Sequence, residues 1–119
     1  MKRNIFFAFT LALLLTILAV TLFAEPDEGT IGAPPAVAEV KIDNFSFGPN
    51  DLKVAVGTTV TWTNRDDIPH TVVSTEGAFK SKVLDTDERF SFTFSKAGSY
   101  PYFCSIHPKM TGKILVVVQ

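Results

Sequence analysis

The sequence predicts an all-β protein, an antiparallel β-sandwich of about seven or eight short strands. Apolar residues alternate with period two from Glu39 onward, which is typical of strands with one buried face. Gly, Pro, Asn and Asp interrupt this alternation at short intervals, and no long helical period follows the N-terminal segment. With 119 residues, of which 46% are hydrophobic, the chain has room for one compact domain.

The strand-like segments can be placed in chain order by the apolar residues that share a face. These are Val40 and Ile42; Val54 and Val56; Val60 and Trp62; 71–74; Phe90, Phe92 and Phe94; Tyr100 and Tyr102; and 114–118. Trp62 and both tyrosines are expected to lie in the core. The segment 77–88 has no clear period and is compatible with a short helix.

The N-terminus predicts export from the cytoplasm. Two basic residues precede an apolar run that ends at Ala24, which is typical of a signal peptide and also long enough for an N-terminal membrane anchor helix. Residues 25–38 are rich in Pro, Gly, Ala and acid and are expected to form a flexible linker to the domain at 39–119. We therefore expect the protein in the periplasm or on the outer face of the cytoplasmic membrane.

Charge and cysteine content narrow the possible functions. The net charge is −1 and no basic run could neutralise a row of phosphates, which argues against a nucleic-acid partner. The acidic pair Asp66 and Asp67 is interpreted as part of a solvated loop. Cys104 is the only cysteine, so no internal disulfide can form. A lone exported thiol is prone to oxidation unless it is buried or bound to metal.

Four side chains could form one metal site. Cys104, His107 and Met110 follow one another at spacings of three, where one short turn can present all of them. His70 lies at the junction of two earlier strands, and a sandwich can bring both loops to the same end. Each residue alone is more often structural, but the chain contains only two His, one Cys and one Met beyond Met1. One thiolate, two imidazoles and a thioether are the donors of a blue-copper site, whereas zinc rarely accepts a thioether.

At these residues the chain from about Glu39 to Gln119 resembles the cupredoxin family of type 1 blue-copper proteins, which includes plastocyanin. Its Cys-x-x-His-x-x-Met spacing is similar to the short ligand loop of amicyanin, and residues 52–70 resemble the upstream half of the family. The resemblance implies an eight-stranded Greek-key sandwich. It also implies that His70, Cys104 and His107 are equatorial ligands of one copper ion and that Met110 is the axial ligand.

Two positions depart from the family pattern. The residue after the first ligand His is commonly Asn, whose backbone amide donates to the Cys sulfur and whose side chain ties the two ligand loops together. Here it is Thr71, which preserves the backbone donor. The sequence leaves open whether its side chain also ties the two loops together. Phe103 replaces the exposed Tyr that precedes the Cys in plastocyanin, so a remote second electron port is not expected.

The leading functional hypothesis is a monomeric one-electron carrier that docks transiently, near His107, with a redox protein donor and acceptor. A copper storage or delivery protein would use the same ligands, but such proteins usually have open or Met-rich sites. An enzyme with Cys104 as nucleophile is the third alternative. The sequence shows no orienting carboxylate or Asn at a useful spacing, so the protein is predicted not to be an enzyme.

Overall fold

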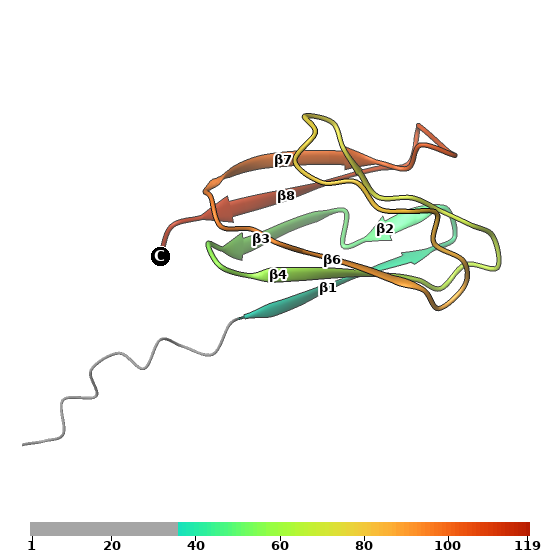
Figure 1. The fold of residues 1–119 in the computed structure, drawn as a ribbon, viewed down its shortest axis with the longest axis horizontal. Helices are drawn as coiled ribbons and strands as arrows, with labels where there is room; N and C mark the ends of the chain where they lie inside the picture. Colours follow the sequence, from blue (N-terminus) through green and yellow to red (C-terminus); the bar gives the residue numbers. More distant parts are fainter. Residues whose placement is uncertain (1–35) are drawn as a thin grey trace, which may run out of the picture.

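The computed structural model describes residues 36–119, which form two packed four-stranded sheets (Figure 1). The strands are β1 (Val37–Asp43), β2 (Ser46–Gly48), β3 (Asp51–Ala55), β4 (Thr59–Asn64), β5 (Val73–Ser74), β6 (Arg89–Thr93), β7 (Gly98–Phe103) and β8 (Thr111–Val117). One sheet has the order β2-β1-β4-β6 and the other β3-β8-β7-β5. The predicted all-β sandwich is confirmed.

The N-terminal boundary differs slightly from the expected one. β1 begins at Val37, two residues before the predicted start of the domain at Glu39. The predicted signal peptide or anchor (1–24) lies outside the described residues, as does most of the linker. Within residues 36–119, no helix has the length and apolar character needed to cross a membrane.

The sheets are mixed, whereas the sequence predicted an antiparallel sandwich. β1 pairs in parallel with β4, and β3 pairs in parallel with β8, while the other neighbouring strands are antiparallel. Side chains alternate between the two faces in both kinds of pair. The sequence pattern therefore identifies the strands but not their relative directions.

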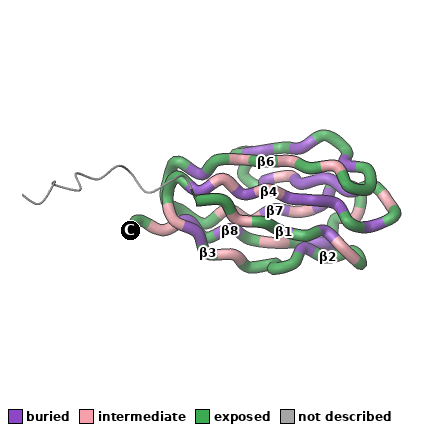
Figure 2. Tube along the Cα trace, turned by 90° about the horizontal axis from the view of Figure 1, so that it is seen from below, coloured by how far each residue is buried: buried purple, intermediate pink, exposed green. Residues whose placement is uncertain are grey.

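The core lies between the two sheets (Figure 2). Val60 and Trp62 of β4 are completely buried, and Trp62 packs against a group of aromatic rings: Phe79, Phe90, Phe94 and Tyr102. On the outer face of the same sheet, hydroxyls of β4 and β6 meet in pairs, Thr59 with Thr93 and Thr61 with Ser91, both at 2.7 Å. This arrangement confirms the predicted inward and outward faces of these strands.

The segment 77–88 contains no helix and instead runs alongside the His70 region. Isolated bridges join Val73 to Lys80 and His70 to Leu84. The Ser81 hydroxyl accepts a hydrogen bond from the backbone amide of Val72 at 2.8 Å. The segment thus supports the part of the chain that follows β4, and in Figure 1 it runs from the middle of the sandwich toward the end opposite the C-terminus.

Candidate metal centre

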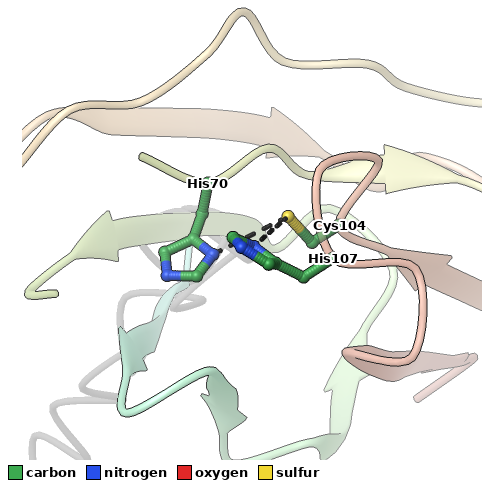
Figure 3. A group of neighbouring side chains, drawn as sticks. All are labelled: His70, Cys104 and His107. Atoms are coloured by element: carbon green, nitrogen blue, oxygen red, sulfur yellow. Dashed lines mark hydrogen bonds between the residues drawn. The ribbon is translucent and has the colours of Figure 1, made fainter. Parts of the chain in front are cut away.

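Three of the four predicted ligands converge at one end of the sandwich (Figure 3). The ligand atoms of His70, Cys104 and His107 all lie within 4.8 Å of one another. The Cys104 Sγ atom is 3.7 Å from His70 Nδ1 and 3.8 Å from His107 Nδ1. One sulfur and one nitrogen bound to the same metal ion are separated by at most about 4.3 Å. Each imidazole nitrogen therefore lies close enough to the sulfur to share one ion with it.

The loop between β7 and β8 is closed by its own backbone. The Cys104 amide donates to the Met110 carbonyl at 3.0 Å, and the Met110 amide donates to the His107 carbonyl at 2.9 Å. Met110 is 5% exposed, so its side chain lies in the protein interior directly after this turn. These bonds hold the spacing of three residues in a compact turn, as the sequence predicts. The role of Met110 as a ligand stays a prediction.

The environment of Cys104 favours its thiolate form. Burial raises the pKa of the thiol, but hydrogen-bonding contacts of the sulfur with the Thr71 amide, the ring of His70 and the backbone and ring of His107 lower the pKa to about 6. The Thr71 amide lies 3.4 Å from the sulfur. A thiolate at neutral pH is the form that binds metal.

Thr71 also ties the two ligand loops together, which answers the question that the sequence left open. Its hydroxyl accepts a hydrogen bond from the Ser105 amide at 2.7 Å and lies 2.7 Å from the Ser105 hydroxyl. Ser105 directly follows Cys104, so the bond joins the residue after one ligand to the residue after another. Thr71 with Ser105 therefore provides a side-chain tie that the family usually builds with Asn.

The loop that carries His70 is organised by a buried asparagine at the end of β4. The Asn64 side-chain amide donates to the Ile68 and Leu84 carbonyls, both at 2.9 Å, and its oxygen accepts the Asp66 amide at 2.9 Å. His70 and Leu84 exchange two backbone hydrogen bonds, at 2.7 and 3.1 Å. Asn64 thus holds the loop before His70, Leu84 holds the His70 backbone, and His70 is fully buried.

Asp66 is not the solvated residue that the sequence suggested. It is 8% exposed, and its Oδ2 atom lies 2.7 Å from His70 Nε2. Burial raises the pKa of Asp66, but hydrogen bonds from Phe45, His70 and Asn44 outweigh this effect and hold the pKa below its ordinary value. A carboxylate only accepts, so Nε2 of His70 carries the proton and Nδ1 keeps its lone pair for a metal. Asp67, the other member of the pair, is exposed as expected.

Phe45 is a second residue that sequence reasoning missed. Its ring is perpendicular to both imidazoles, with centroid distances of 5.8 Å to His70 and 5.1 Å to His107. The sequence signal that could have identified Phe45 was its position as an aromatic residue in a turn between two short strands. The signal for Asp66 was a carboxylate four residues before a candidate ligand within one short loop.

The donor set fits copper. It combines a thiolate held by backbone donors with two imidazoles that both direct Nδ1 at the sulfur. Soft sulfur together with imidazole is the ligand chemistry of a blue-copper centre. Since His70 is fully buried and His107 is half-buried, only one imidazole of the pair reaches solvent.

Comparison with known proteins agrees with this geometry. The family model of the cupredoxin-like domain matches residues 10–116. The chain is 38% identical to amicyanin of Paracoccus denitrificans, over 78% of this chain and 82% of the relative. It is 33% identical to amicyanin-alpha of Methylorubrum extorquens, over 92% of this chain and 96% of the relative.

Solved cupredoxin structures superpose on the same fold. A purple cupredoxin from Nitrosopumilus maritimus superposes with a TM-score of 0.63 at 37% identity, covering 67% of this chain and 99% of that one. A reduced amicyanin variant superposes with a TM-score of 0.65 at 35% identity, covering 72% of this chain and 87% of that one. The match of the family model over most of the sequence, together with these relatives, shows that the chain belongs to the cupredoxin-like domain family.

Proposed function

We propose that the protein is a type 1 blue-copper electron carrier in which His70, Cys104, His107 and Met110 hold one copper ion. The observation that carries the proposal is the convergence of one stabilised thiolate and two imidazole Nδ1 atoms within 4.8 Å. Bound copper would supply a one-electron couple between Cu(II) and Cu(I). The amicyanin and plastocyanin relatives support the same assignment.

The protein's own residues suit a carrier because the fold holds the ligands of both loops in fixed positions. His70 is held by Leu84 and Asp66, and Cys104 is held by the Thr71 amide and the closed loop. A ligand set that is held by the fold changes little when the charge of the ion changes. Electron exchange at such a site needs little rearrangement.

The docking surface is proposed to surround His107. The half-buried imidazole is flanked by Ile106, which is 42% exposed, and by the exposed Pro108. On the His70 loop, Pro69 is exposed and Ile68 is half-buried. A small apolar rim around an imidazole edge suits brief contact with a redox protein. We propose that this exchange takes place outside the cytoplasm, with the protein acting as a monomer.

One feature of the structure would suit an enzyme, namely a carboxylate that orients the His70 ring. Asp66, His70 and Cys104 follow one another as in a Cys-His-Asp nucleophile arrangement, contrary to the sequence-based expectation. However, Cys104 and His70 are both 0% exposed, so a substrate carbonyl cannot approach the sulfur. The arrangement fits a metal ligand with an oriented imidazole better than a nucleophile, and we propose that the protein is not an enzyme.

Titration of the metal-free full-length protein with Cu(II) tests the function. We expect intense blue absorption that saturates at one copper per chain, followed by a reversible one-electron wave in voltammetry. Copper should stay bound through repeated reduction in the presence of a Cu(I) chelator. Release of the ion on reduction would favour the storage or delivery alternative, and copper binding without intense colour would contradict a type 1 site.

A second prediction concerns Met110. Met110→Gln is expected to retain copper and to lower the reduction potential, because an amide oxygen favours Cu(II) more than a thioether does. Each tenfold gain in relative affinity for Cu(II) lowers the potential by about 59 mV. Voltammetry of the two proteins at one pH measures the difference, and an unchanged potential would show that Met110 is not a ligand.

A further inference from the structure

Asp66 joins three parts of the molecule through one carboxylate. Its Oδ1 atom accepts a hydrogen bond from the Asn44 amide at 2.7 Å. Its Oδ2 atom accepts one from the Phe45 amide at 3.0 Å and another from His70 Nε2 at 2.7 Å. The Asp66 backbone is fixed as well, since its carbonyl accepts the Thr86 hydroxyl at 2.6 Å. Both oxygens of a nearly buried carboxylate are therefore used.

The two amides that Asp66 binds belong to a turn that needs support. Asn44 and Phe45 form the two-residue turn between β1 and β2, since Asp43 pairs with Ser46. Both turn residues have positive φ, 49° and 56°. Asn tolerates this region, but a bulky aromatic residue rarely adopts it and does so at a cost in free energy. β2 has only three residues, so the hairpin itself contributes little to hold the turn.

This unfavourable backbone places the Phe45 ring next to the metal centre. The ring is 54% exposed, so burial does not explain its position. It stands perpendicular to both imidazoles, whose own centroids are 5.1 Å apart. The aromatic side chain therefore lies against the edge of the His pair.

We propose that Asp66 is a positioning residue that joins His70 to the β1–β2 turn and thereby holds the Phe45 ring as a cap over the two imidazoles. The proposal rests on the copper site proposed above. Asp66 sets which nitrogen of His70 faces the ion, and the same carboxylate sets how far the imidazoles are shielded from water. Ligand orientation and shielding thus depend on one group.

Asp66→Asn separates these contacts, because an amide offers one acceptor and one donor where three N–H groups converge. If the asparagine NH₂ takes the place of Oδ2, the Phe45 amide loses its acceptor, and His70 Nε2 can pair with the NH₂ only by accepting, which moves the His70 proton to Nδ1. If the NH₂ takes the place of Oδ1, the Asn44 amide loses its acceptor. The matched control is Asp67→Asn, which removes the same charge from the exposed neighbouring residue.

The experiment is NMR on the metal-free full-length protein, so it does not depend on copper loading. In the unsubstituted protein we expect slow exchange of the Asn44 and Phe45 amides and a His70 ring protonated at Nε2. In Asp66→Asn we expect amide exchange at least about tenfold faster, as for the loss of one charge-assisted hydrogen bond, or a His70 proton at Nδ1. Asp67→Asn should show neither change.

The proposal would be overturned if both amides of the unsubstituted protein exchanged as fast as free turn amides, or if Asp66→Asn matched Asp67→Asn. The first of these outcomes needs no variant, so the test remains valid even if Asp66→Asn does not fold. If the unsubstituted protein failed to bind copper, the proposed function would be contradicted. The NMR results on the metal-free protein would still test the role of Asp66.

The cap is tested separately with Phe45→Leu, which keeps Asp66 and the exposed turn. A neutral gadolinium chelate in solution should broaden the His70 and His107 ring signals more in this variant than in the unsubstituted protein. The chain has only two histidines, so their signals are readily assigned. Val56→Ala, an exposed site beside Val117 at the other end of the sandwich, serves as control. Equal broadening in Phe45→Leu and Val56→Ala would exclude shielding by Phe45.

Discussion

Cys104→Ser is expected to abolish the visible absorption of the copper-loaded protein. The blue colour of such a site comes from the sulfur–copper bond, and a serine hydroxyl cannot replace the thiolate. Cys104 is completely buried among core residues, and serine is close to it in size, so the fold should persist. Absorption spectra of both proteins after addition of one equivalent of Cu(II) measure the effect.

Far-ultraviolet circular dichroism provides the control for Cys104→Ser, because it reports whether the strands remain. A folded variant without colour supports Cys104 as the ligand. Intense visible absorption in a folded variant would exclude it. Since Cys104 is the only cysteine, no other thiolate can take its place.

Gly112→Ala is expected to destabilise the domain strongly. Gly112 lies opposite Tyr102 in the pairing of β7 with β8, and a Cβ atom there would overlap the Tyr102 phenol ring and hydroxyl. Tyr102 is 1% exposed and is packed against Phe47 and Trp62, so it has little room to move. Overpacking of this kind costs about 1–3 kcal/mol in the free energy of unfolding. For a domain of this size, each kcal/mol lowers the melting temperature by about 4–8 °C.

A double-mutant cycle identifies the cause of that loss. If the overlap with Tyr102 is responsible, Gly112→Ala should cost much less in a Tyr102→Leu background, where the phenol is absent. Thermal unfolding of the four proteins measures both costs. Equal costs in the two backgrounds would show that the glycine is needed for another reason.

The strands could be predicted from the sequence because their residues alternate regularly. Val60 and Trp62 face the core as expected, and Phe90, Phe92 and Phe94 pack on the same side. The parallel pairs β1–β4 and β3–β8 could not be predicted, because alternation is the same for either strand direction. Segment 77–88 was ambiguous because its structure is set by contacts with residues 70–74 and not by a period of its own.

The candidate site was predictable to the extent that its residues are rare and closely spaced. His70, Cys104, His107 and Met110 could be selected because the chain offers almost no other soft donors or imidazoles. Asp66 could not be interpreted correctly, since carboxylates next to each other are usually solvated. Two of its three partners come from a turn more than twenty residues away, and only the tertiary structure brings them together.

The parallel pairing of β3 with β8 has a consequence for the order in which the molecule is made. β3 (Asp51–Ala55) pairs with a strand that is synthesised much later than β3 itself, and such sequence-distant pairings form slowly. The turn 104–110 connects β7 to β8. Cys104, His107 and Met110 therefore acquire their positions only when β8 pairs with β7. A nascent chain that has not yet released Thr111–Val117 thus has no complete site, and only a chain in which β8 has docked presents all of these side chains together.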